Sequence, residues 1–180
     1  MFLGIIMGMP ITLLPTQLLL VNLVTDGLPA IALGVEPAER ENMKQPPRRS
    51  DESFFSDGLM TKIIFRGILI GLCTLGCFAL FTYMFGDLTI ARTGALFTLI
   101  MSQLAHVFEC KSEKKNIFTV PYFSNPKLIL AVLVSAAVIF AAMYVPFLQI
   151  IFTTAPLTLK QLLIAFGFAM FAPLLQCVLK

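Results

Sequence analysis

The chain has 180 residues, of which 58% are hydrophobic and 13% are charged, with a formal net charge of +3. Soluble domains carry about 25% charged residues, so this composition excludes a soluble globular protein. The small net charge says nothing about nucleic acid, and no nucleic-acid partner is expected. The apolar runs have the length of helices rather than the alternation of barrel strands. The predicted fold class is therefore all-α: a polytopic transmembrane helix bundle in a lipid bilayer.

The predicted elements begin with residues 2–9, an apolar segment that is too short to span a bilayer. We interpret it as the end of a helix, one partial N-terminal helix, and not as a signal peptide, because a basic leader and a cleavage site are missing. Five full spans follow, each about the length that a bilayer requires. They are expected at about residues 14–34, 60–86, 94–110, 128–148 and 159–179.

The segments between the spans predict the orientation. Residues 35–59 and 111–127 are rich in Lys and Arg, so the positive-inside rule assigns both to the cytoplasm. The links 87–93 and 149–158 contain only Arg92 as a basic residue and are assigned to the outside. We therefore expect a multi-pass protein of the plasma membrane whose C-terminus is cytoplasmic.

Asp26 lies near the middle of the first span. A carboxylate at this depth costs about 2.5–3.5 kcal/mol on insertion scales, so it needs a partner, a proton or a bound cation. Asn22 lies one helical turn earlier and Thr25 is adjacent, which places three oxygen-bearing side chains near one helix face. Hard oxygen donors suit a hard cation such as Ca²⁺. A structural polar cluster that holds helices together is the alternative interpretation.

The residues after Asp26 predict a locally loosened helix. Pro29 has no N–H to donate to the carbonyl of Thr25, and Gly27 is conformationally permissive. The arrangement resembles the broken helices that bind ions in transporters.

The third span contains further polar residues. Gln103 lies within the membrane, where its carbonyl can coordinate an ion or merely contribute polarity between helices. His106 and Glu109 lie nearer the cytoplasmic end, as a proton-linked pair or as interface polarity, and interface polarity is favoured for Glu109. In the second span, Gly67 and Gly71 have the spacing of a helix-packing face.

No catalytic or cofactor-binding residue is predicted. The chain has no Gly-rich phosphate loop, no Asp-Lys-Thr-Gly phosphorylation motif and no plausible triad. Its four cysteines lack metal-binding spacing, and we interpret them as small hydrophobic residues. They are Cys73, Cys77, Cys110 and Cys177.

Residues 17–30, Gln-Leu-Leu-Leu-Val-Asn-Leu-Val-Thr-Asp-Gly-Leu-Pro-Ala, resemble the sixth transmembrane helix of type II P-type cation ATPases, the calcium pumps above all. Residues 33–37 and 43–48 resemble the cytoplasmic loop that follows that helix. Residues 116–118 and 124–126 resemble the loop between helices eight and nine. The resemblance covers essentially the whole chain, 1–180, as a C-terminal membrane domain from the end of helix five through helix ten.

This resemblance implies that Asn22 and Asp26 bind the transported Ca²⁺, and that Thr25 with the same Asp serves a second site where one exists. By ungapped alignment, Gln103 stands where two-site pumps carry an acidic residue, which implies one Ca²⁺ per cycle. ATP and Mg²⁺ would act only through the cytoplasmic domains that, with helices one to five, are missing from these residues. The chain alone is therefore expected to be inactive. A small ATP-independent membrane transporter or a structural membrane subunit is the alternative function.

Overall fold

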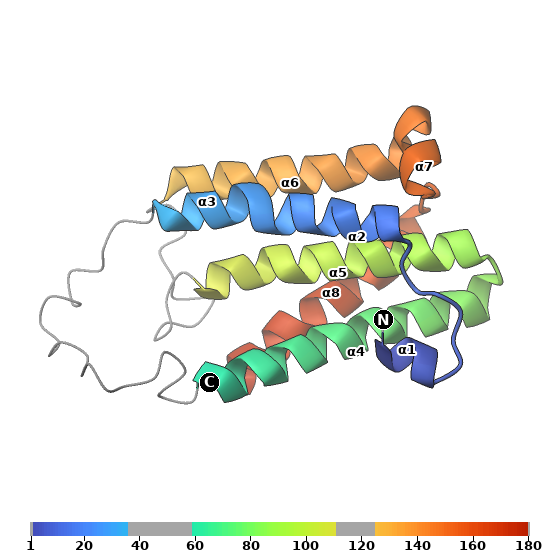
Figure 1. Ribbon diagram of the computed structural model, residues 1–180, viewed down its shortest axis with the longest axis horizontal. Coiled ribbons are helices and arrows are strands. Elements are labelled where there is room, and N and C mark those ends of the chain that lie inside the picture. The colour runs from blue at the N-terminus through green and yellow to red at the C-terminus, as the bar shows by residue number, and fades with distance from the viewer. Residues whose placement is uncertain (1, 36–58, 111–124, 180) are drawn as a thin grey trace, which may run out of the picture.

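The structure is a computed structural model that describes residues 2–35, 59–110 and 125–179. Throughout these ranges the regular elements are helices and no strand occurs, so the expected all-α fold is confirmed (Figure 1). The elements are α1 (Phe2–Ile6), α2 (Pro15–Asn22), the π-helical η1 (Leu23–Gly27), α3 (Leu28–Gly34), α4 (Leu59–Phe85), α5 (Leu88–Cys110), α6 (Pro126–Tyr144), α7 (Pro146–Phe152) and α8 (Leu159–Leu179).

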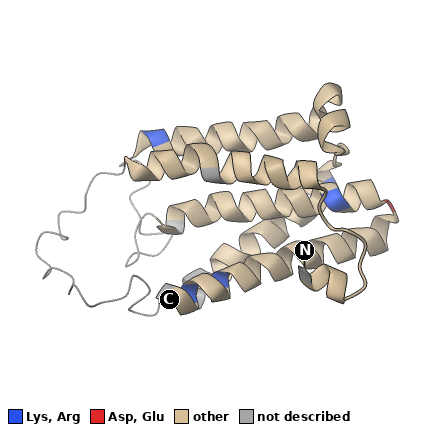
Figure 2. Ribbon diagram, viewed as in Figure 1, with Lys and Arg blue, Asp and Glu red and all other residues tan. Residues whose placement is uncertain are grey.

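Within the described ranges, four helical stretches are long and apolar enough to cross a membrane: Pro15–Gly34, Met60–Phe85, Leu88–Phe108 and Pro126–Tyr144. Leu159–Leu175 is a shorter apolar helix. The charged side chains of the described residues gather near the helix ends, and none of them lies in the middle of the bundle (Figure 2). This distribution is the one that a helical membrane bundle requires.

Two helices differ in extent from the expected spans. α5 begins at Leu88, well before residue 94, because the Asp87 Oδ1 accepts a hydrogen bond from the Thr89 N–H at 2.7 Å and caps the first turn. The Thr93 hydroxyl then donates to the Thr89 carbonyl at 2.8 Å, so this polar stretch is compatible with a helix. α6 ends at Tyr144, before residue 148, because Pro146 disfavours helical geometry at the preceding Val145 (φ −86°, ψ 118°).

The helices form two groups that meet at α5. The continuous helix α2–η1–α3 lies beside α6, while α4 and α8 pack against each other and against α5 (Figure 1). Buried aromatic residues of α4 and α5 fill the core between them. Phe81 lies against Gly94, where an added Cβ would come within 2.7 Å of the ring, so only glycine allows this approach.

The interpretations of the cysteines and of the Gly67–Gly71 pair are only partly confirmed. Cys73 and Cys77 are buried, whereas Cys110 is exposed and the Cys177 side chain lies outside the described residues. No described atom lies within 4 Å of a Cβ added at Gly67 or Gly71. The packing face expected from their spacing is therefore not used within the described part of the chain.

Candidate functional site

The helix that carries Asp26 changes its winding at the expected place. A π-helical turn at Leu23–Gly27 separates α2 from α3, and Gly27 has φ −75° and ψ −94°. Pro29 is buried and cannot donate to the carbonyl of Thr25, so a regular α-helical ladder cannot continue through this point. The predicted loosening is confirmed, and π turns of this kind occur frequently at functional sites.

Helix α6 supports the interrupted helix at two places. The Ser135 hydroxyl donates a hydrogen bond of 2.8 Å to the carbonyl of Val24, inside the π turn. The Asn125 amide donates to the carbonyl of Ala32 at 2.9 Å and also caps α6 through its Oδ1, which accepts from the Leu128 N–H at 3.1 Å. The sequence analysis missed both residues. A serine inside an apolar helix and an asparagine directly before a proline were the available signals.

The three predicted ligands of the first span have different surroundings. Thr25 is buried, and its hydroxyl donates to the carbonyl of Val21 at 2.8 Å. Asn22 is exposed, so the structure does not bury these two side chains together. The backbone of Asp26 belongs to the π turn, while its side chain lies outside the described residues.

Gln103 carries an unsatisfied amide oxygen. Its side chain is half-buried, and the Oε1 atom is buried without a hydrogen-bond partner in the described part of the chain. Such an atom costs about 1–3 kcal/mol. Helix α5 contacts the π turn, so Gln103 lies on a helix adjacent to it. A buried amide oxygen without a hydrogen-bond donor is suited to bind a cation.

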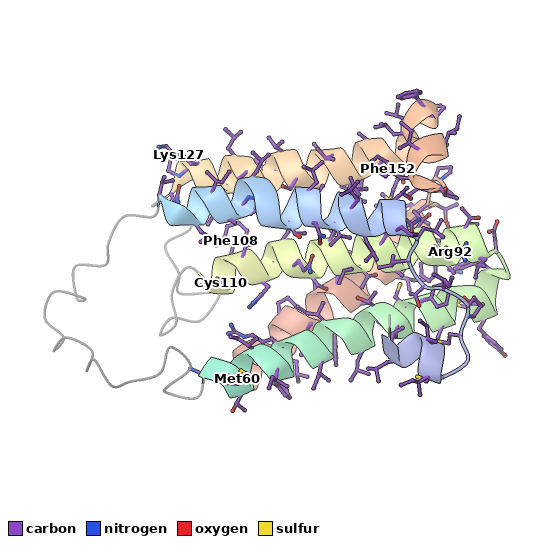
Figure 3. The ribbon with its side chains drawn as sticks, viewed as in Figure 1. Met60, Arg92, Phe108, Cys110, Lys127 and Phe152 are labelled. Carbon is purple, nitrogen blue, oxygen red and sulfur yellow. The ribbon has the colours of Figure 1, made fainter. Side chains whose placement is uncertain are left out.

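The described side chains at the end of α5 form no cluster that could hold a metal ion. The Cys110 Sγ lies 3.5 Å from the His106 Nε2, and the Glu109 side chain lies outside the described residues (Figure 3). The described residues contain no cluster of three His, Cys, Asp or Glu side chains that could hold a metal ion.

Gln17 holds the opposite end of the interrupted helix. Its side chain is fully buried, its Nε2 donates to the carbonyls of Phe152 at 3.1 Å and Thr153 at 3.2 Å, and its Oε1 accepts from the Leu14 N–H at 3.0 Å. Phe152 lies at the α7 end of the bundle (Figure 3). The sequence analysis assigned no role to Gln17, although Gln at the third position of a helix is a capping signal.

Comparison with known proteins identifies the family. Residues 10–180 match the family described as "Cation transporting ATPase, C-terminus". A calcium-transporting ATPase of Bacillus subtilis is 40% identical over 168 residues, which is 93% of this chain and 19% of that protein. Calcium-transporting ATPase 1 of Bacillus cereus is 34% identical over 196 residues, covering 100% of this chain and 22% of that protein.

A plant relative extends the similarity. Calcium-transporting ATPase 4, endoplasmic reticulum-type, of Arabidopsis thaliana is 30% identical over 235 residues, which is 99% of this chain and 22% of that protein. The chain thus spans about a fifth of the length of these curated relatives. From the match over residues 10–180 we conclude that the chain belongs to the family of C-terminal domains of cation-transporting ATPases.

Proposed function

We propose that the chain is the C-terminal membrane part of an ATP-driven Ca²⁺ pump of the plasma membrane, with its C-terminus in the cytoplasm. Relatives named calcium-transporting ATPases support this assignment, as does the order of the helices. ATP and Mg²⁺ act through cytoplasmic domains of the longer protein, and the polar segment 35–59 couples them to the membrane part.

The observation that carries the proposal is the π turn in the middle of an apolar helix. In the proposed site Asp26 supplies the negative charge, while Asn22 and Thr25 add neutral oxygens. Gln103 contributes its unpaired amide oxygen from α5 as an auxiliary ligand. The exposed side of Asn22 then faces the remaining helices of the pump.

Calcium requires more oxygens than these residues supply. Ca²⁺ takes about six to eight oxygen ligands at roughly 2.3–2.6 Å, so further ligands must come from helices outside this chain. A helix whose backbone ladder is already interrupted can reposition its ligands without breaking a regular helix. The π turn therefore provides the adjustable half of the site, and α5 and α6 provide its fixed support.

The test is Asp26→Asn in the full-length pump. Removal of the charge should lower Ca²⁺-dependent phosphorylation by ATP by about 100-fold or more, equivalent to roughly 3 kcal/mol. Phosphorylation by inorganic phosphate without Ca²⁺ should persist, which reports that the protein is folded. Asp87→Asn is the matched control, because Asp87 lies in the turn between α4 and α5. Unchanged Ca²⁺-dependent phosphoenzyme in the Asp26 variant would refute the proposal.

The 180-residue chain on its own provides a second test. With too few oxygens for a complete site, it should bind Ca²⁺ no more tightly than about millimolar in equilibrium ⁴⁵Ca binding, with Asp26→Ala as the control. Micromolar binding that disappears in Asp26→Ala would instead favour a small transporter that works without the rest of a pump.

A further inference from the structure

The short helix α7 presents an apolar face away from the rest of the bundle. Phe147, Ile150 and Ile151 are 70%, 80% and 44% exposed, and their spacing of three and four residues places them on one side of the helix. Leu148 and Phe152, on the other side, are partly buried, and Phe152 packs against the main core. An exposed apolar patch of this kind marks a surface that contacts either protein or membrane.

Hydrogen bonds hold α7 in this orientation. The Gln17 Nε2 at the start of α2 donates to the carbonyls of Phe152 and Thr153. The Gln149 Nε2 donates to the carbonyl of Met143 on α6 at 2.6 Å. Helix α7 is thus tied to both α2 and α6, and it cannot turn its apolar face inward without losing these bonds.

Helix α6 fixes the level of α7 in the bilayer. Its 19 residues span roughly 28 Å at about 1.5 Å per residue, and the hydrocarbon layer of a bilayer is about 30 Å thick. Lys127, in the first turn of α6, keeps its charged end at one membrane surface. Tyr144 therefore reaches the opposite edge of the hydrocarbon layer, and α7 begins directly after it.

The direction and the composition of α7 agree with this level. Figure 1 shows α7 lying across the end of the bundle, at the same end as the turn between α4 and α5. Residues 128–159 contain no charged side chain, so no charge in this stretch draws α7 into bulk water. An apolar helix face that lies along a membrane surface enters about 5–10 Å into the boundary between headgroups and acyl chains.

We propose that α7 is an interfacial helix that lies in the plane of the membrane, with Phe147, Ile150 and Ile151 in contact with phospholipid. Lipid is the occupant because the exposed residues 144–147 join this face directly to the end of a membrane-spanning helix. The contact is apolar and does not depend on the charge of the headgroup. The proposal rests on the membrane bundle and not on the identity of the transported ion.

Photocrosslinking in the full-length pump identifies what covers this face. An encoded p-benzoylphenylalanine in place of Ile150, in phosphatidylcholine vesicles, should attach a phospholipid on irradiation, visible as a peptide that gains the mass of one lipid. The same replacement of Phe147 should do so too. Replacement of Leu148, on the inner side of the same helix, is the matched control and should crosslink within the chain. Replacement of Leu133, which is 61% exposed on α6, is the reference for contact with lipid.

The depth of α7 is a separate measurement. A nitroxide attached to an encoded p-azidophenylalanine at position 150 should lie within about 5–10 Å of the boundary between headgroups and acyl chains. Its depth is measured from collisions with oxygen and with a water-soluble nickel complex. The same nitroxide at position 133 should lie deeper, because that position is well inside the span of α6. Both labels are encoded, so other residues of the longer protein do not interfere.

Three results would overturn the proposal. Crosslinks from positions 147 and 150 to another segment of the pump or to a second copy would identify a protein interface. Absence of any adduct at both positions, while position 133 gives one, would place the face in water. A nitroxide at position 150 as deep as that at position 133 would exclude an interfacial helix. Since neither measurement requires a transported ion, each of these results would leave the calcium assignment intact.

Discussion

The helix Pro15–Gly34 and helix α8 each contain an interior proline, and their backbones differ at that point. α8 remains α-helical from Leu159 to Leu179 although Pro173 cannot donate to the carbonyl of Ala169. The Ser102 hydroxyl on α5 donates to that carbonyl at 2.9 Å and replaces the missing bond. Near Pro29, the chain instead widens into the π turn Leu23–Gly27.

The comparison teaches that a proline alone does not open a helix. At Pro146, where α6 does end, the hydroxyl of Thr154 donates to the carbonyl of Ala142, so this carbonyl is satisfied although the helix stops. Two features distinguish the Pro29 region. Gly27 is conformationally permissive, and the Ser135 hydroxyl donates to the carbonyl of Val24 rather than to the carbonyl of Thr25. The neighbouring helix thus stabilises the widened turn in one region and a regular helix in the other.

Among the variants that test this comparison, Pro29→Ala in the full-length pump should have the largest effect. The new N–H can bond the carbonyl of Thr25, so the helix should approach regular winding and the proposed ligands should move apart. We expect the apparent Ca²⁺ affinity, measured from the Ca²⁺ dependence of phosphorylation by ATP, to fall by about tenfold, equivalent to roughly 1.4 kcal/mol. Pro173→Ala is the matched control and should change it less than about twofold. Equal effects of the two variants would break the comparison.

A smaller effect is expected for Ser135→Ala. The variant loses the 2.8 Å bond to the carbonyl of Val24, and such bonds between membrane helices are worth about 0.6 kcal/mol on average and up to roughly 1.7. Apparent Ca²⁺ affinity should fall by about threefold. Ser102→Ala removes the corresponding bond of α8 and should lower thermal stability without altering Ca²⁺ affinity. If Ser102→Ala lowered Ca²⁺ affinity equally, the two hydroxyls would not have separate roles.

The smallest effect is expected for Gln103→Ala. Gln103 lies on α5, the helix that contacts both the π turn and α8. The Oε1 atom loses no hydrogen bond within the described chain, so the variant should unfold at an unchanged or slightly higher temperature. In a one-ion pump the auxiliary ligand is dispensable, and Ca²⁺ affinity should change by less than about twofold. A ratio of two Ca²⁺ per ATP in the unaltered pump would contradict the single-site interpretation.

The sequence by itself determined the class of protein and the location of the interrupted helix. Hydropathy and charge predicted a helical membrane bundle, and Pro29 with Gly27 predicted the loosening that the structure contains at Leu23–Gly27. These predictions succeed because they depend on local physics: the cost of placing charge in lipid, and an N–H group that proline lacks. The same local rules underestimated the length of α5. They predicted a polar link up to residue 93, whereas Asp87 caps a helix that begins at Leu88.

Only the tertiary structure decided which atoms support the site. Ser135 and Val24 are 111 residues apart, and Gln17 lies 135 residues from Phe152. Hydrophobic periodicity distinguishes the faces of a helix in water, but lipid is as apolar as a protein core, so helices that are apolar on every side give little indication of their neighbours. Helical spacing placed Asn22 and Thr25 near one face, and only the packing of the described helices decided that Thr25 is buried and Asn22 exposed.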